Sequence, residues 1–182
     1  KFAERAHYSQ SAIDDQLSNQ LLQNYIDDLD GGRHYFLQSD IAYFSKYRYE
    51  LDDTLKSGNM EAVFDIFRLY RLRAQQRLTY AISLLDEKPD FGIDEHYMFD
   101  RKNMLWPADT VEMHELWRQR TKNDLLSLTL TDKTHEQAKE VLTKRYQQVL
   151  KRINQLDTDD VFENFINTFG CFERIEINSK PV

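Results

Sequence analysis

Prolines and glycines are scarce in this chain, with three prolines and five glycines among 182 residues. Both residue types form tight turns or interrupt regular backbone, so a fold built from many short strands would need more of them. Their scarcity favours long helices. We therefore predict an all-α fold, a multi-helix bundle of about six helices.

Apolar residues recur every three or four positions along most of the chain, which is the period of one face of a helix. The longest stripe predicts a helix over about 59–86, with a buried seam at Val63, Phe67, Tyr70, Ala74, Leu78, Ala81 and Leu85. Five shorter stripes predict helices that begin near Ser11, Ser39, Asp109, Thr134 and Asp157.

Polar and glycine residues mark the expected ends of these helices. Three pairs resemble capping boxes: Ser11 with Asp14, Asp109 with Glu112, and Thr134 with Gln137. The acidic run 157–160 suits the positive end of a helix dipole. Helices are predicted to end at Gly31-Gly32, Gly58 and Gly170. The last twelve residues indicate a short strand through Ile175 and Ile177.

Residues 87–108 break the helical pattern and form a long, aromatic-rich loop. It is punctuated by prolines and a glycine, and it contains Phe91, Tyr97, Phe99 and Trp106. Exposing so much apolar surface to water is costly, so we predict that this loop packs over the helices.

The overall charge excludes some classes of partner. A net charge of −7 is opposite to the cationic surface with which proteins displace counterions from nucleic acid, so no nucleic-acid partner is expected.

No apolar run approaches the length of a membrane span. A single cysteine, Cys171, cannot form an internal disulfide. The first residues have no hydrophobic signal region, which indicates a cytosolic or an already processed chain.

Metal chemistry has little support in the residue spacing. A di-iron bundle needs Glu-x-x-His twice, and here it occurs once, at Glu4 and His7. His114 lies near two glutamates, but not in a His-Glu-x-x-His pattern. The acidic run Asp27, Asp28, Asp30 and Gly31 lacks the register of a calcium loop. We interpret these residues, and Asp157, Asp159 and Asp160, as surface, boundary or capping groups rather than metal ligands.

Nucleophilic catalysis is equally unsupported. No serine lies in Gly-x-Ser-x-Gly or Ser-x-x-Lys, no glycine-rich phosphate loop is present, and Cys171 shows no sign of activation. We therefore predict no catalytic, cofactor-binding or metal-binding residues. The basic side chains Arg68, Arg71, Arg73 and Arg77 lie mostly off the seam of their helix. They either pair with carboxylates of neighbouring helices, which we favour, or bind an acidic partner.

Several short stretches, in this order and spacing, resemble the N-terminal domain of tail-specific proteases, also called carboxy-terminal processing proteases, a branch of the serine peptidases. Together they span about residues 7 to 169. The stretches are His7-Tyr8, Tyr25–Asp30, Tyr35–Ile41, Phe64–Phe67, Tyr80–Leu85, Asp100-Arg101, Trp106-Pro107, Leu116-Trp117, Leu126–Leu130, Lys144–Tyr146 and Asp160–Phe162.

The resemblance implies a non-catalytic helical domain of a periplasmic serine endopeptidase. In such a parent, a PDZ domain and a Ser–Lys catalytic dyad lie downstream. The enzyme degrades or trims proteins that present apolar C-terminal tails, and the helical domain helps to enclose the protease core and position substrates. Some members dock a lipoprotein adaptor built of tetratricopeptide repeats.

The resemblance stops after Phe169, where the family continues with a segment containing Asp-Pro-His-Thr and a tyrosine. We therefore expect residues 1–169 to be the helical domain and 170–182 a divergent tail, which marks a fragment boundary, a truncated gene or true divergence. No catalytic serine or lysine can be assigned to this chain. Two alternatives stay open: a stand-alone helical interaction or adaptor module, and a metal-dependent helical enzyme.

A first prediction concerns Trp106. If its ring anchors the loop 87–108 to the helices, Trp106→Ala should lower the free energy of unfolding by about 3–5 kcal/mol. An unchanged melting midpoint would show that the loop is not packed.

Overall fold

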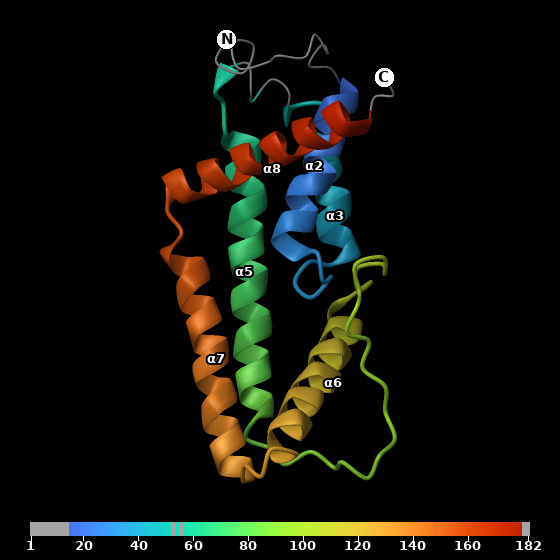
Figure 1. Ribbon diagram of the computed structural model, residues 1–182, viewed down its shortest axis with the longest axis vertical. Coiled ribbons are helices and arrows are strands. Elements are labelled where there is room, and N and C mark those ends of the chain that lie inside the picture. Colours follow the sequence, from blue (N-terminus) through green and yellow to red (C-terminus); the bar gives the residue numbers. More distant parts are fainter. Residues whose placement is uncertain (1–14, 52–53, 55–56, 180–182) are drawn as a thin grey trace. The chain divides into compact units, whose positions relative to one another are not determined.

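The computed structural model in Figure 1 describes residues 15–51, 54 and 57–179, without the side chains of 15–17 and 169–179. This part of the chain contains six α-helices, one 3-10 helix and no strand, which confirms the predicted all-α class. None of the described helices has the length and apolar character to cross a membrane. The elements are α2 (Asp15–Asp30), α3 (Gln38–Phe44), η1 (Ser45–Tyr47), α5 (Glu61–Leu84), α6 (Thr110–Thr129), α7 (His135–Gln155) and α8 (Thr158–Ser179).

The chain forms two compact units. The first comprises Lys1–Gly31, Asp40–Leu69 and Leu156–Val182, and the second comprises Gly32–Ser39 and Tyr70–Gln155. Each unit has its own buried apolar side chains, as the periodic stripes predict, and each is described separately below.

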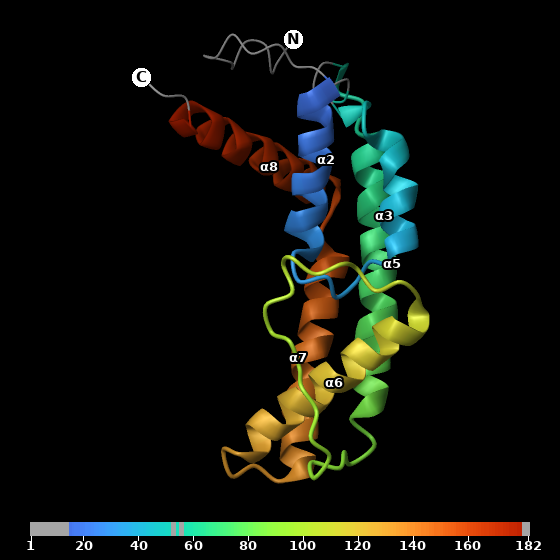
Figure 2. The same cartoon turned by 90° about the vertical axis from the view of Figure 1, so that its right-hand side faces the viewer.

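In the first unit, α8 crosses α2 and packs against it (Figure 2). The Tyr25 ring meets the Phe165 ring edge-on, with 5.4 Å between the ring centroids. Around this pair the apolar faces of the helices remove most of their surface from water, which drives the packing. The buried side chains include Leu21, Leu22, Ile26, Val63, Ile66, Phe67 and Val161.

In the second unit, α6 packs against α7, and Trp117 of α6 is fully buried. Its indole N–H donates to the carbonyl oxygen of His34 at 2.7 Å. The ring of Tyr146 from α7 approaches Trp117 with 6.2 Å between centroids. Small residues of α5, Ala74 and Ala81, are also completely buried, and their size lets neighbouring elements approach closely.

The predicted caps of the later helices are confirmed. The Asp109 carboxylate accepts from the Glu112 amide. The Thr134 hydroxyl accepts from the Gln137 backbone amide, and the Gln137 side-chain oxygen accepts from the Thr134 backbone amide. At the start of α8, Asp157 accepts from the amide of Asp160, and the Asp160 carboxylate accepts from the Asp157 amide. Each contact satisfies an amide that the first turn of a helix leaves without a partner. The Ser11–Asp14 pair lies outside the described residues.

Two of the predicted helix-ending glycines are also confirmed. Helix α2 ends at Asp30, and a side chain on Gly31 would lie 2.8 Å from the Asp27 carbonyl oxygen. Gly58 has a φ of 80°, a left-handed conformation that favours glycine, and its amide donates to the Thr54 carbonyl.

The prediction of one helix from Ser39 to Gly58 is wrong. Helix α3 ends at Phe44, and the 3-10 helix η1 follows. Helical backbone returns at Leu51, Thr54 and Ser57, before Gly58. At the break, the Ser45 hydroxyl donates to the Ala42 carbonyl. Such side-chain bonds compete with the helical ladder.

The predictions for the C-terminal end are also corrected. Helix α8 continues through Gly170 and includes Ile175 and Ile177, so there is neither a cap at Gly170 nor a strand. A glycine inside a helix costs only about 1 kcal/mol, and no proline follows before Pro181.

Within α6, Val111 is 77% exposed and does not join Leu116 and Trp117 in the core.

The loop 87–108 packs on the helices through only some of its apolar residues. Phe91 and Tyr97 pack against the core of the second unit, and Pro107 is buried. Phe99 and Leu105 point the other way and are 73% and 78% exposed. The prediction that the loop is packed is therefore confirmed for its inward-facing residues alone.

Trp117, rather than Trp106, should show the larger stability effect, because Trp106 is only partly buried. We expect Trp117→Ala to lower the free energy of unfolding by about 3–5 kcal/mol. Urea denaturation followed by circular dichroism measures this difference. Val111→Ala, at an exposed position of the same helix, is the control and should change stability by about 0.5 kcal/mol or less.

Candidate interaction site

Several of the residues considered as metal ligands make structural contacts in the part of the chain that the structure describes. No group of three or more histidine, cysteine, aspartate or glutamate side chains gathers among the described residues in a way that could hold a metal ion. The His114 ring stacks on Tyr80, with 4.1 Å between centroids. Asp28 accepts a hydrogen bond from Thr168 of α8. Glu4, His7 and the side chain of Cys171 lie outside the described part.

The arginines of α5 have mixed surroundings. Arg68 pairs with Asp65 of the same helix at 3.0 Å, and not with a neighbouring helix as expected. Arg77, predicted to lie mostly off the seam, is only 3% exposed. The buried stripe of this helix is therefore wider than its apolar residues alone indicate.

The aromatic loop is held at two points within the second unit. At the first, the Tyr97 hydroxyl and Nε2 of His34 form a hydrogen bond of 3.0 Å. At the second, the Arg33 guanidinium lies 3.8 Å from the centre of the Trp106 ring. The side-chain amide of Gln38 donates to the Trp106 carbonyl, and the backbone amide of Gln38 donates to the Pro107 carbonyl. These two bonds fix the backbone of the loop at Trp106 and Pro107.

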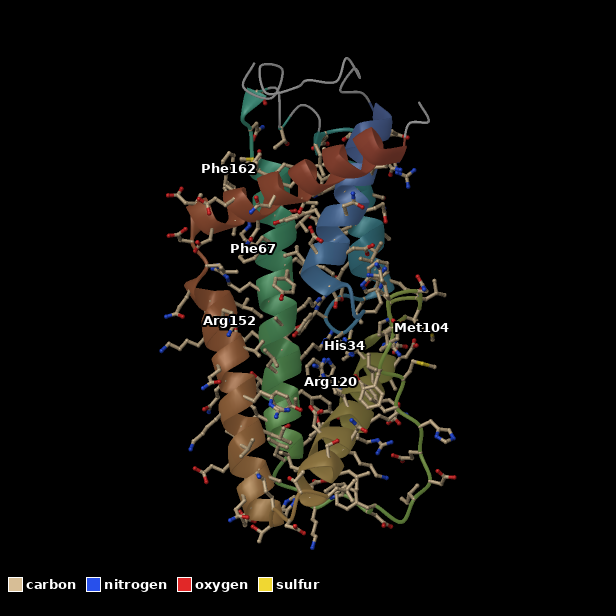
Figure 3. All side chains as sticks on the ribbon, in the orientation of Figure 1. His34, Phe67, Met104, Arg120, Arg152 and Phe162 are labelled. Atoms are coloured by element: carbon tan, nitrogen blue, oxygen red, sulfur yellow. The ribbon has the colours of Figure 1, made fainter. Side chains whose placement is uncertain are left out.

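His34 lies between the loop and α6, where Figure 3 labels it together with Arg120. Burial, and then the positive charges of Arg120 and Arg101, lower the pKa of His34 to about 3. The imidazole is therefore neutral at physiological pH. The His34 ring is hydrogen-bonded to Tyr97 of the loop, and the His34 carbonyl accepts from Trp117 of α6. His34 therefore connects its own segment to the loop and to α6, rather than acting as an acid–base group.

An ion cluster ties the middle of the loop to α6. The Glu95 carboxylate accepts from Arg118 at 2.9 Å and from Lys122 at 3.1 Å, and Arg118 also pairs with Glu115. The Arg118 and Lys122 partners lower the pKa of Glu95. Lys122 in addition donates to the Ile93 carbonyl. The i, i+3 spacing of Glu115 and Arg118 on a helix could have revealed their pair. Nothing in the sequence points to Glu95 as the partner of Arg118 and Lys122.

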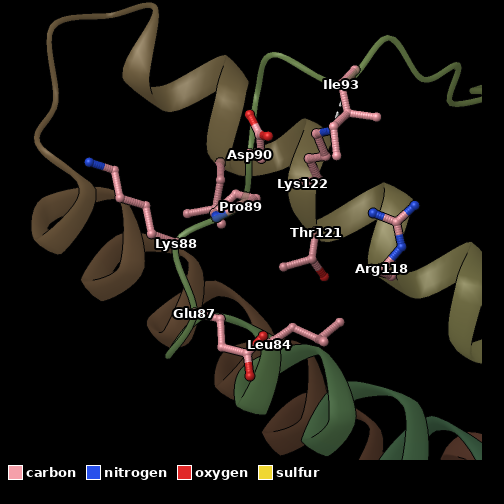
Figure 4. Close-up of a pocket in the computed structure, with 10 residues that line it drawn as sticks. Leu84, Glu87, Lys88, Pro89, Asp90, Ile93, Arg118, Thr121 and Lys122 are labelled. Atoms are coloured by element: carbon pink, nitrogen blue, oxygen red, sulfur yellow. Dashed lines mark hydrogen bonds between the residues drawn. The ribbon is translucent and has the colours of Figure 1, made fainter.

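A pocket of about 270 Å³ lies beside this cluster, between the end of α5, the start of the loop and α6 (Figure 4). The Thr121 hydroxyl is the one alcohol among its lining residues, which include no histidine or cysteine. The lining also contains the carboxylates of Glu87 and Asp90 and the amines of Lys88 and Lys122, but the Thr121 hydroxyl forms no hydrogen bond to any of them. The pocket can bind a small polar group. The lining residues are Leu84, Glu87, Lys88, Pro89, Asp90, Ile93, Arg118, Thr121, Lys122 and Leu125.

The first unit has a separate polar cluster around Asp65 of α5. Its carboxylate accepts from the hydroxyls of Tyr43 and Tyr47, and Lys46 lies 3.7 Å from the Tyr43 ring centre. The Tyr47 hydrogen bond, followed by smaller effects of Tyr43, Arg68 and Lys46, lowers the pKa of Asp65 to about 2. These contacts join the end of α3 and η1 to α5, and sequence spacing gave no sign of them.

The chain matches known proteins over nearly all of its length. Residues 1–171 match the family described as the tail specific protease N-terminal domain. A tail-specific protease of Haemophilus influenzae is 37% identical over 167 residues, which are 91% of this chain and 24% of that protein. The chain belongs to the tail-specific protease N-terminal domain family.

Membership of this family agrees with the resemblance seen in the sequence. The matched region includes every element that builds the aromatic loop and its anchors, from Arg33 to Trp117. The chain spans about a quarter of the length of the Haemophilus relative. The activity of that longer protein therefore does not follow from the match alone.

The Asp65 cluster predicts a pH dependence. Because the folded-state pKa of Asp65 is lowered from 3.8 to about 2, its contribution to stability is present above about pH 4 and is lost as the pH falls towards 2. We expect Asp65→Asn to flatten this part of the curve of unfolding free energy against pH. Tyr47→Phe, which removes the main hydrogen bond, should flatten it in part. Parallel curves for Asp65→Asn and wild type would show that the cluster does not form.

Proposed function

We propose that this chain is the non-catalytic N-terminal domain of a periplasmic serine endopeptidase that degrades or trims proteins from apolar C-terminal tails. The observation that carries the proposal is the 37% identity to a tail-specific protease over 91% of this chain. The chain itself supplies helical scaffold, and the Ser–Lys dyad belongs to a downstream region of the parent.

The chemistry of the described residues supports a scaffold role. Several groups that could act as acids, bases or ligands are engaged in a cap, an ion pair or a hydrogen bond, as at Asp109, Glu95 and His34. Acid–base catalysis needs a titrating group near neutral pH with access to substrate. The pKa of His34 is about 3, far below neutral pH, so its imidazole does not titrate in that range.

The role that we propose is to enclose the protease core and to position substrate. Enclosure requires extended rigid surfaces rather than reactive groups, and long helices provide them. At 1.5 Å per residue, the 21 residues of α7 extend for about 32 Å. The proposed partners are the PDZ and protease domains of the parent, protein substrates with apolar C-termini, and a lipoprotein adaptor built of tetratricopeptide repeats.

The gene offers the simplest test of this proposal. We expect the reading frame to continue past Val182 into a PDZ-like segment and a Ser–Lys region. A stop codon directly after Val182 would contradict the proposal and would favour a stand-alone helical interaction module.

A proteolysis assay tests the division of labour. The full gene product should cleave a reporter protein that ends in apolar residues, and residues 1–182 alone should leave it intact. A matched reporter ending in charged residues controls for tail recognition. Cleavage of the apolar reporter by residues 1–182 alone would show that this domain has its own catalytic site.

A further inference from the structure

Large apolar side chains are exposed on one short segment of the second unit. Five of the twelve exposed large hydrophobic residues among those described fall within residues 98–111, which we call the apolar segment. Figure 3 shows one of them, Met104, at the outer edge of the loop. The five residues and their exposed fractions are Met98 55%, Phe99 73%, Met104 46%, Leu105 78% and Val111 77%.

Loose backbone does not account for this exposure. Before the segment, Tyr97 is hydrogen-bonded to His34, and the centroids of the Tyr97 and Phe99 rings are 5.1 Å apart. Near its end, Trp106 lies under Arg33, and the Pro107 carbonyl accepts from the Gln38 amide. A turn closed by the Met104 amide and the Arg101 carbonyl shapes the part between. The segment is thus held on both sides with its apolar side chains facing outwards.

The composition of the segment is that of an interface. Single exposed hydrophobic residues are common on protein surfaces, but concentrations of them mark interaction sites. Methionine, phenylalanine, tryptophan and arginine are enriched at interfaces, and the segment contains Met98, Phe99, Arg101, Met104 and Trp106. Methionine also adapts its shape to a partner. Holding the backbone before binding lowers the entropy cost of association.

We propose that the apolar segment docks against a folded part of the longer tail-specific protease, outside residues 1–182. This inference rests on the proposed function. The Haemophilus relative is about four times as long as the matched region, so a parent of that size has ample chain to supply the partner.

The limited size of the surface favours such a partner over a second copy or a free protein. Five side chains expose on the order of a few hundred Å², whereas each partner in a stable complex between separate proteins buries about 800 Å². A domain on the same chain is present at an effective concentration on the order of millimolar, and interfaces within a chain can be correspondingly small.

Hydroxyl-radical labelling with mass spectrometry tests the docking. Labelling of Met98, Met104 and Leu105 should be fast in residues 1–182 alone and several-fold slower in the full gene product. Tyr49, 58% exposed on the first unit, should be labelled similarly in both, and Met113, fully buried, should stay protected in both.

A matched pair of variants sharpens the test. Leu105→Asp should leave the melting midpoint of residues 1–182 unchanged, because Leu105 is 78% exposed. In the full gene product it should restore fast labelling of Met98 and Met104. Leu130→Asp is the control, at a residue that is 76% exposed outside the segment, and it should not restore labelling.

Each of the following outcomes would overturn the inference. Equal labelling of the segment in both proteins would show that nothing covers it. Protection that appears only with an added apolar-tailed polypeptide would make the segment a substrate surface. Protection of residues 1–182 that grows with their concentration would assign it to a second copy. A full gene product that cleaves the reporter but leaves the segment unprotected would refute the docking while the proposed function stands.

Discussion

The hydrogen bond from the buried indole of Trp117 to the His34 carbonyl is the contact on which the second unit depends. It joins α6 to the segment that follows α2, with the Trp117 side chain completely buried and His34 partly buried. A buried N–H without a partner would cost about 1–3 kcal/mol, so the ring position and the course of residues 32–39 are fixed together. The aromatic loop then attaches to that segment through Tyr97 on His34 and Trp106 on Arg33.

This arrangement divides the aromatic loop into residues that stabilise the unit and residues that are available to a partner. Phe91, Tyr97 and Pro107 face the helices, and Phe99 and Leu105 face outwards. The ion cluster at Glu95 attaches the same loop to α6 through charged side chains. A domain that contributes surfaces rather than chemistry to a protease would need this combination of firm backbone and exposed apolar side chains.

Sequence pattern predicted the features of this fold that local physics determines. The seam from Val63 to Leu85 and the caps at Asp109 and Thr134 depend on residue spacing within one element, and they are confirmed. The break after α3 was missed because apolar residues continue at helical spacing from Ile41 and Phe44 to Leu51, whereas the Ser45 hydroxyl bonds the Ala42 carbonyl and a 3-10 helix follows. The helix through Gly170 was missed because the cost of one glycine is small compared with the rest of a long helix.

The candidate site was predictable only in outline. The cost of exposing aromatic side chains correctly indicated a packed loop, but it cannot say which side chains face inwards, since that depends on the anchors. The sequence did not single out His34, and its lowered pKa arises from burial and two arginines that folding brings near it. Glu95 gave no signal, and neither did the bonds from Tyr43 and Tyr47 to Asp65, because these partners lie on other elements.

Backbone order in the loop tests the account most directly. The anchors at Tyr97 and Trp106 predict that residues 97–107, although exposed, are nearly as rigid as the helices, with NMR order parameters close to about 0.85 for residues 1–182 in solution. Order parameters below about 0.6 through Met98–Leu105 would show a free loop. They would contradict the claim that Trp117, through His34, holds an apolar surface ready for a partner.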